Sequence, residues 1–167
     1  MEQWDLYDEN FKKLNKVANR GDTLNDNEYH LVINAWIIND NNEFLITQRS
    51  PNKSHACMWE CTGGSALHGE SDIDACVREI REELGINIDV NTARFIGQDR
   101  RYFKGCPDIL RVYLFHDNTL LQDIHIQEEE VMDVMWASKD KILELYHNGQ
   151  FEANAYFKEI IEMNNGI

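Results

Sequence analysis

Three glutamates are spaced so that their carboxylates share one face of a helix. Glu79, Glu82 and Glu83 occupy positions i, i+3 and i+4, which are neighbours on a helix surface. Like charges this close destabilise a helix, and Arg78, four residues before Glu82, can offset part of the repulsion. One interpretation is a solvated acidic face. The other is a site for Mg²⁺, which takes oxygen ligands and is held by few carboxylates together with substrate phosphates.

The helix that must carry these glutamates has clear boundaries in the sequence. Ser71 can cap its first turn, and Asp74, three residues later, completes a capping-box pattern. Gly85 is well placed to end the helix in a left-handed turn. The face beside the glutamates is apolar at helical spacing and consists of Ile73, Cys76, Val77, Ile80 and Leu84. The sequence therefore predicts a helix that docks on a sheet and presents its acidic face beside the contact.

A longer pattern surrounds this helix. The 23 residues from Gly64 to Ile86 read GSALHGESDIDACVREIREELGI. They resemble the Nudix hydrolase signature, GX5EX7REUXEEXGU with U aliphatic, at every constrained position: Gly64, Glu70, Arg78, Glu79, Ile80, Glu82, Glu83, Gly85 and Ile86. The fixed identities would coincide by chance about once in 10⁸ registers at ordinary residue usage. The resemblance favours a metal site over a solvated face.

The resemblance implies a Nudix fold, an α/β/α sandwich around a mixed β-sheet with a loop–helix–loop catalytic element. It also implies hydrolysis of a diphosphate linked to another moiety, with Mg²⁺ or Mn²⁺ as cofactor. Glu79, Glu82 and Glu83 would bind the metal. Arg78 would orient Glu79, and Glu70 would support the metal cluster as a fourth acid from the loop. The resemblance does not assign the general base among these glutamates.

A second, weaker resemblance lies outside the signature. The segments WDLYDEN, RGD, YHLVINAWIIN, FLITQRSPNKS and MWECTGG are similar to the branch of Nudix proteins related to isopentenyl diphosphate isomerase. That enzyme uses a cysteine and a histidine-rich metal site. The cysteine and the following histidine correspond here to Gly63 and Ser65, and Cys61 is two residues out of register. His30 matches one isomerase metal ligand, but the partner position is Thr23. An isomerase is therefore the runner-up.

Other candidate residues for substrate binding have weaker support. Basic residues near predicted strand ends or loops could meet phosphates, with solvated surface charge as the alternative; they are Arg49, Lys53, Arg100, Arg101 and Lys104, of which Arg49, Lys53 and Arg101 are the selected substrate candidates. The run 128–130 could supply a loop carboxylate to the metal or act as base, or it could be a solvated turn. Aromatic residues could stack on a base, although aromatic residues in strands are more often core; they are Trp59, Tyr102, Phe103 and Trp136.

The remaining elements are predicted from β-branched runs and turn signals. Residues 29–38 and 43–49 are expected to form a hairpin. Residues 1–28 fit either a helix or, better, a hairpin with its turn near residues 8–10. Further strands are expected at about 58–62, 93–103, 109–116 and 131–137, and helices at about 139–147 and 152–163. This order predicts an α+β or mixed α/β fold, with residues 1–167 as one domain.

Composition limits the partners. Sixteen Lys and Arg against 30 Asp and Glu give a formal net charge of −14, which disfavours DNA, RNA and anionic membranes. The chain has no run of apolar residues long enough to span a bilayer and no secretory pattern at its start. The four cysteines fit neither a disulfide framework nor a zinc ribbon. A cytoplasmic location and a small-molecule diphosphate partner are expected, and the sequence leaves a homodimer open.

The expected function is metal-dependent hydrolysis of a diphosphate (pyrophosphate) linkage. The substrate class favoured is a nucleoside di- or triphosphate or a nucleoside diphosphate derivative. Two alternatives remain beside it: an enzyme similar to isopentenyl diphosphate isomerase, and a Nudix-fold domain that binds a diphosphate without turnover. The intact set of Arg78, Glu79, Glu82 and Glu83 argues against a pure binder, which has no need of all four.

Overall fold

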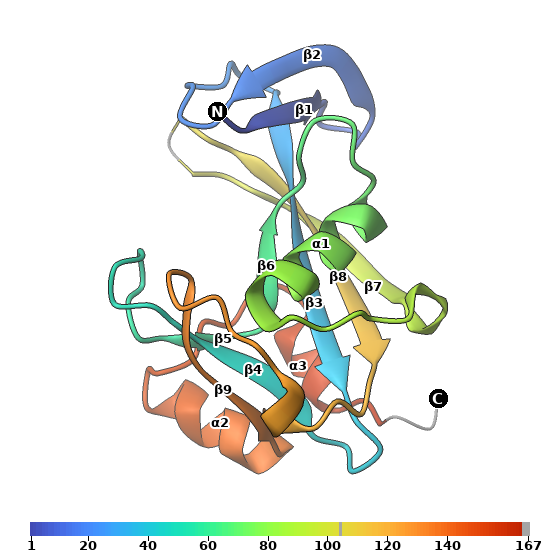
Figure 1. Cartoon of the computed structure of the whole chain (residues 1–167). Coiled ribbons are helices and arrows are strands. Elements are labelled where there is room, and N and C mark those ends of the chain that lie inside the picture. The colour runs from blue at the N-terminus through green and yellow to red at the C-terminus, as the bar shows by residue number, and fades with distance from the viewer. Residues whose placement is uncertain (104, 165–167) are drawn as a thin grey trace.

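A long central strand, β3 (Tyr29–Ile38), organises the fold (Figure 1). One of its edges pairs in parallel with β8 (Asp108–His116), and β7 (Arg94–Arg101) continues the sheet antiparallel to β8. The other edge is shared by strands from different parts of the chain, including β1 (Gln3–Tyr7) and β6 (Thr62–Ser65). This computed structural model describes residues 1–103 and 105–164, and their strands form a nine-stranded mixed sheet.

The strand β4 (Phe44–Arg49) follows β3 across a turn but leaves it almost at once. The two strands are registered only at Ile38 and Phe44. Beyond that pair, β4 pairs with β9 (Val131–Ala137) and with β5 (Trp59–Glu60). The predicted hairpin is therefore right in its strands and its turn, but wrong in its pairing, because β6 occupies the edge of β3 that β4 would need.

Successive residues of the central strands alternate between two apolar layers. Leu31, Ile33 and the other odd-numbered β3 side chains pack in one cluster with α1 (Asp72–Leu84). Trp36 and Ile38 pack in a second cluster with α2 (Lys139–His147) and α3 (Phe157–Ile161). A strand covered on both faces needs a continuous apolar run, which explains its sequence. Helices thus lie on both sides of the sheet, which confirms the α/β/α sandwich and the α+β class (Figure 1).

The last helix is shorter than the sequence predicted. The expected helix over 152–163 is reduced to α3, because Tyr156 has a left-handed backbone with φ 65°. The Tyr156 hydroxyl donates a hydrogen bond to the Gln98 carbonyl at 2.9 Å, and its ring lies where a side chain at Gly97 would be. This contact with β7 fixes the turn. Two 3₁₀ turns are also present, Val90–Thr92 before β7 and Leu121–Asp123 after β8.

The N-terminal segment forms a hairpin, the better of the two expected alternatives. β1 pairs antiparallel with β2 (Lys13–Asn19). The Asp8 carboxylate accepts hydrogen bonds from the backbone N–H of Asn10 at 2.8 Å and of Lys12 at 3.0 Å, which closes the turn. Since β1 also pairs with the start of β3, the hairpin is an extension of the central sheet.

Two further features bear on the expectations from composition. All four cysteines, Cys57, Cys61, Cys76 and Cys106, are free thiols. Cys76 lies fully buried on the apolar face of α1, as expected for a core residue. Across residues 1–103 and 105–164, no helix combines the length and the apolar character that crossing a bilayer requires.

Candidate active site

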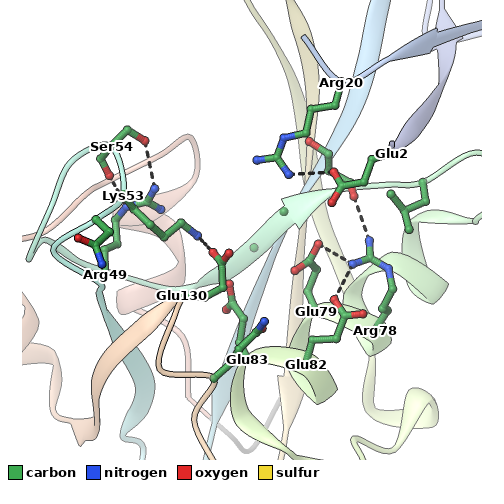
Figure 2. Close-up of a pocket in the computed structure, with 16 residues that line it drawn as sticks. Glu2, Arg20, Arg49, Lys53, Ser54, Arg78, Glu79, Glu82, Glu83 and Glu130 are labelled. Atoms are coloured by element: carbon green, nitrogen blue, oxygen red, sulfur yellow. Dashed lines mark hydrogen bonds and ion pairs between the residues drawn. The ribbon is translucent and has the colours of Figure 1, made fainter.

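Four separated segments of the chain meet around one cleft of ≈ 580 Å³ (Figure 2). The segments are the N-terminal hairpin, the loop after β4, the stretch from β6 through α1, and the loop that precedes β9. The lining residues are Glu2, Arg20, Arg49, Asn52, Lys53, Ser54, Gly63, Gly64, Ser65, Leu67, Arg78, Glu79, Glu82, Glu83, Gln127 and Glu130. Every predicted metal or catalytic residue except Glu70 is in this group.

Local sequence fixes the helix that carries the acids. The Ser71 hydroxyl accepts from the Asp74 N–H at 3.1 Å and the Asp74 carboxylate accepts from the Ser71 N–H at 3.2 Å, which confirms the capping box. Gly85 ends the helix with φ 69°, also as predicted. Ile80 and Leu84 on the adjoining face are fully buried in the core cluster between α1 and the sheet. This packing fixes the rotation of the helix about its own axis.

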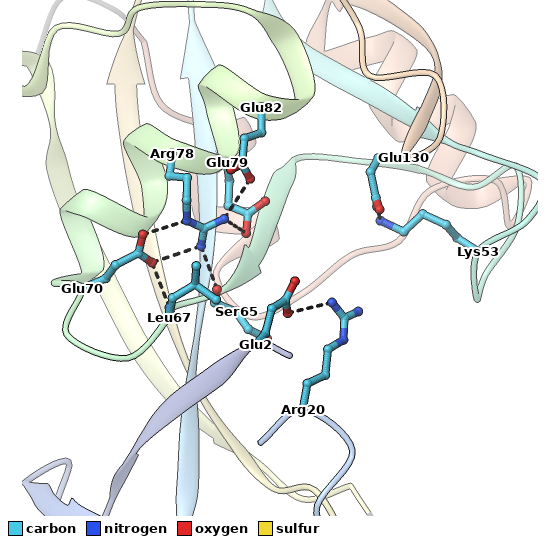
Figure 3. A network of polar contacts seen from close by, with 10 residues as sticks. All are labelled: Glu2, Arg20, Lys53, Ser65, Leu67, Glu70, Arg78, Glu79, Glu82 and Glu130. Atoms are coloured by element: carbon cyan, nitrogen blue, oxygen red, sulfur yellow. Dashed lines mark hydrogen bonds and ion pairs between the residues drawn. The ribbon is translucent and has the colours of Figure 1, made fainter. Parts of the chain in front are cut away.

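Arg78 joins three of the acids into one network (Figure 3). Its guanidinium donates to both oxygens of Glu70, at 2.7 and 3.1 Å. It also donates to Glu79 at 2.8 Å, to Glu82 at 3.0 Å and to the Ser65 carbonyl at 3.0 Å. Both Glu70 oxygens are thus engaged, one of them also by the Leu67 N–H at 2.8 Å. Glu70 therefore positions Arg78, and the structure does not place it among the acids that line the cleft.

The carboxylate of Glu79 rests directly on the backbone of Gly64. A Cβ atom added at Gly64 would lie 2.1 Å from a Glu79 oxygen and 2.4 Å from its carboxyl carbon, so only glycine permits this contact. Burial raises the pKa of Glu79, and the hydrogen bond and charge of Arg78 act in the opposite direction. The first glycine of the signature is thus explained by the space that the carboxylate occupies.

Glu83 is the most deeply buried acid of the cleft, with 6% of its surface exposed. Within the described chain, its side chain has no hydrogen bond and no ion pair that would stabilise a charge. Burial, together with the neighbouring charges of Glu79 and Glu60, raises its pKa well above the ordinary value. A buried carboxylate facing other acids is stabilised most directly by a cation.

The donor set of the α1 acids fits a hard divalent ion, since it consists of carboxylate oxygens alone. We call Glu79, Glu82 and Glu83 the acid wall. In the described residues, no three Asp, Glu, His or Cys side chains converge closely enough to hold an ion as they stand. Arg78 explains this, because it draws the carboxylates of Glu79 and Glu82 toward itself.

Cations line the cleft opposite the acid wall. Arg49 and Lys53, both predicted substrate candidates, are among them. Arg49 donates to Glu60 at 2.6 Å and to the Ser54 carbonyl at 2.7 Å, so it also folds its own loop. Lys53 makes an ion pair with Glu130 (Figure 3). Of the run 128–130, only Glu130 reaches the cleft.

A third cation of the cleft, Arg20, follows β2 in the N-terminal hairpin and was not predicted from the sequence. Its guanidinium pairs with Glu2 at 2.8 Å, and both residues line the cleft (Figures 2 and 3). The position of Glu2 and Arg20 depends on the pairing of β1 with β3. No local sequence pattern predicts this pairing. We call Arg20, Arg49 and Lys53 the cation wall.

The structure does not bring the other basic candidates into the cleft. Arg101 donates to both oxygens of the buried Asp108, at 2.7 and 2.9 Å, and to Asn154, so its guanidinium is used within the fold. Arg100 lies over the ring of Phe11 at 6.0 Å. Lys104 lies outside the described residues. The prediction of Arg101 as a substrate residue therefore has no support from its position.

The aromatic candidates also lie elsewhere. Trp59 is buried in the core cluster of α2 and α3, and Trp136 donates its indole N–H to the Thr119 carbonyl at 3.0 Å. Tyr102 and Phe103 are exposed, but neither is among the residues that line the cleft.

The isomerase-like positions are not arranged as a metal site. His30 is buried and stacks on Trp4, with 4.2 Å between the ring centroids, and its Nδ1 lies 3.3 Å from the Pro107 carbonyl oxygen. Gly63 is closed to any side chain, because a Cβ atom would lie 2.6 Å from both the Ile33 carbonyl and the Asn34 amide. A cysteine could not occupy this position without displacing β3 backbone.

Comparisons with known proteins agree on one family. The NUDIX domain family matches residues 28–157. An uncharacterised Nudix hydrolase of Listeria innocua is 33% identical over 167 residues, covering 99% of this chain and 96% of the relative. A CTP pyrophosphohydrolase of Escherichia coli is 31% identical, covering 66% of this chain and 77% of the relative. An isopentenyl-diphosphate Delta-isomerase of Escherichia coli is also 31% identical, covering 76% and 69%.

A crystal structure from Deinococcus radiodurans superposes with a TM-score of 0.74 at 22% identity, covering 95% of this chain and 97% of that one, which supports the fold. The sandwich, the signature helix and the family match together define an enzyme class, the hydrolases built on this loop–helix–loop element. The chain belongs to the Nudix family and is a Nudix hydrolase. Divalent metal ions are general cofactors of that family, which agrees with the all-carboxylate donor set.

Proposed function

We propose that this Nudix hydrolase cleaves a diphosphate linkage in a nucleoside di- or triphosphate, or in a nucleoside diphosphate derivative, with Mg²⁺ or Mn²⁺ as cofactor. The observation that carries the proposal is the buried Glu83. It faces Glu79 and Glu60, and its carboxylate has no hydrogen bond or ion pair among the described residues. The charge of Lys53 across the cleft lowers its pKa by less than burial raises it. A cleft that combines unpaired carboxylate oxygens with several cations suits a metal ion together with phosphates.

In this proposal, the acid wall binds the metal, and Arg78 orients the carboxylates of Glu79 and Glu82. Arg78 hydrogen-bonds Glu79 and Glu82 and limits where their carboxylates lie, and Glu70 holds Arg78 from the loop as a positioning residue. When bound, the metal would polarise the phosphate and acidify a water for attack at phosphorus. Lys53 and Arg49 would bind phosphate oxygens and orient the phosphate chain of the substrate toward the acid wall.

Support for a nucleotide comes from the CTP pyrophosphohydrolase among the relatives. The isomerase relative is as similar, but the local structure disfavours its chemistry. Gly63 cannot accommodate a cysteine, and His30 stacks on Trp4 inside the fold. A binding domain without turnover has weaker support, because the chain keeps every acid of the signature.

The direct test is a phosphate-release assay with Mg²⁺ and with Mn²⁺. The panel is nucleoside di- and triphosphates, nucleotide sugars, dinucleoside polyphosphates and prenyl diphosphates. We expect metal-dependent hydrolysis of nucleotides, and loss of product formation when metal is chelated. A rise in melting temperature with a diphosphate but no turnover would favour the binding domain. Rearrangement of a prenyl diphosphate without hydrolysis would favour the isomerase.

A further inference from the structure

The cleft is lined almost entirely by polar and charged side chains. Of its lining residues, Leu67 is the only apolar side chain, and none carries an aromatic ring in the part of the chain that the structure describes. A nucleotide base is usually recognised by stacking on a ring and by hydrogen bonds to its edge. A prenyl group is recognised by apolar surface. This cleft offers neither a ring nor an apolar pocket.

Positive charge is instead distributed around the cleft on three separate segments. Arg20 belongs to the N-terminal hairpin, Arg49 ends β4, and Lys53 lies in the following loop (Figure 2). Arg78 belongs to the opposite wall and is engaged by Glu70, Glu79 and Glu82. A ligand with several anionic groups can therefore be contacted from more than one direction.

Arg20 and Lys53 are held in a way that permits exchange. Each pairs with a carboxylate that is itself partly exposed, Glu2 for Arg20 and Glu130 for Lys53. Exposed ion pairs of this kind contribute little free energy. A phosphate oxygen, with its higher charge, can replace such a carboxylate at small cost. In contrast, the Arg101 pair with buried Asp108 is not available for exchange.

The hairpin that carries Arg20 lies outside the residues that the NUDIX domain model matches. That match begins at residue 28, whereas Glu2 and Arg20 precede it and still line the cleft. The contribution of Arg20 is therefore not encoded by the signature.

We propose that this cleft recognises its substrate through the phosphate chain alone, with Arg20 of the N-terminal hairpin as a specificity-determining residue, and that it recognises neither the base nor an apolar group. This inference rests on the proposed function for its reaction, but it makes a separate statement about binding. The substrate class is any compound with an accessible diphosphate or triphosphate chain whose other moiety extends into solvent.

The first test compares substrates on the intact protein. We expect KM values for ATP, CTP, GTP and UTP to agree within about threefold, because a cleft that does not recognise the base does not distinguish among them; a site that hydrogen-bonds the edge of one base discriminates by about tenfold or more. Inorganic tripolyphosphate should compete with a Ki within about tenfold of these KM values. A preference of tenfold or more for one base, or the failure of tripolyphosphate to compete, would overturn the inference.

The second test uses two matched variants of the hairpin. Arg20→Ala removes the cleft cation, whereas Lys16→Ala removes a cation of similar exposure, 60% against 67%, that pairs with Glu28 and does not line this cleft. We expect Arg20→Ala to raise KM for every nucleotide by about tenfold and to leave kcat within about twofold. Lys16→Ala should change neither. Equal KM values in the two variants would refute the role of Arg20, and their melting temperatures report whether both remain folded.

A binding measurement separates this inference from the proposed function. The melting temperature is recorded with tripolyphosphate and Mg²⁺ for the wild type and both variants. If nothing is hydrolysed but tripolyphosphate stabilises the wild type and Lys16→Ala more than Arg20→Ala, the inference stands and the hydrolase proposal fails. If nucleotides are hydrolysed with strong base preference, the hydrolase proposal stands and the inference fails. If tripolyphosphate neither stabilises nor competes, the inference fails.

Discussion

The acid wall and the cation wall of the cleft differ in how firmly the fold holds their charges. Glu79 lies against Gly64, and Glu83 is buried. The network of Arg78 further restricts Glu79 and Glu82. Arg20 and Lys53, in contrast, extend from the hairpin and a loop, and each makes one ion pair at the rim. A preorganised group contributes to the reaction step, whereas an exchangeable one contributes to binding. Changes in the acid wall should therefore lower kcat, and changes in the cation wall should raise KM.

The largest effect is expected from Glu83→Gln. The change removes a metal-binding charge, and the several kcal/mol that a metal ion contributes to the transition state correspond to a loss of about 10²–10³-fold in kcat. Steady-state kinetics with saturating Mg²⁺ measure it. Near-normal turnover would remove Glu83 from the metal site.

The same substitution should not destabilise the metal-free protein at pH 7. The pKa of Glu83 is raised in the folded state, so ionisation opposes folding, and this destabilisation grows as pH rises from the ordinary carboxyl pKa through the raised value. The melting temperature of Glu83→Gln minus that of the wild type should therefore be positive at pH 7 and shrink toward pH 5. A difference that grows on acidification would contradict the sign of the pKa shift.

A loss of about 10²-fold in kcat is expected from Gly64→Ala. The added methyl group would overlap the Glu79 carboxylate, which must then move by about 1 Å, a displacement of the size that costs two orders of magnitude in preorganised sites. The fold should persist because the displaced atoms end a flexible side chain. Ser65→Ala is the matched control, since it keeps the backbone carbonyl that Arg78 uses. Equal kcat in both variants would show that the position of Glu79 is not critical.

A smaller effect is expected from Lys53→Ala in the cation wall. Removing this charge should raise KM by about tenfold with little change in kcat, because the contact is made equally in the ground state and the transition state. Lys139→Ala, which removes an ion pair with Glu162 outside the cleft, serves as the control. A fall in kcat as large as that of Glu83→Gln would break the distinction between the two walls.

The smallest effect is expected from salt. Exposed charges are screened at physiological ionic strength, whereas buried ones are screened much less. Raising KCl from about 0.05 to 0.3 M should raise KM by a few-fold and leave kcat nearly constant. A constant KM together with a falling kcat would show that salt acts on the charges of the acid wall instead.

The sequence predicted the acid wall far better than the cation wall, and the reason is physical. The helix boundaries at Ser71 and Gly85, its buried face and the Arg78–Glu82 ion pair depend on contacts within a few residues. Such contacts follow from local spacing alone. The orienting contact from Arg78 to Glu79 was implied by the family signature and is present.

The cation wall depends on contacts between distant segments. Arg20 reaches the cleft only because β1 pairs with β3, and Arg101 is withdrawn by Asp108 across the β7–β8 pair. The dependence on contacts between distant segments also explains the errors in the predicted fold. The β3–β4 pairing is limited to Ile38 and Phe44 because β6 takes the rest of that edge, and the last helix is shortened by the contact of Tyr156 with Gly97.

The parallel pairing of β3 with β8 also governs how the chain can fold. Ile38 pairs with His116, so the pairing along this edge of β3 cannot be completed during synthesis until β8 has left the ribosome. Until then, β3 presents apolar side chains on both faces and an unpaired edge, the features that make a nascent chain prone to aggregation. Such long-range pairing also slows folding. The central strand of the sheet is thus a segment exposed to aggregation until β8 becomes available to pair with it.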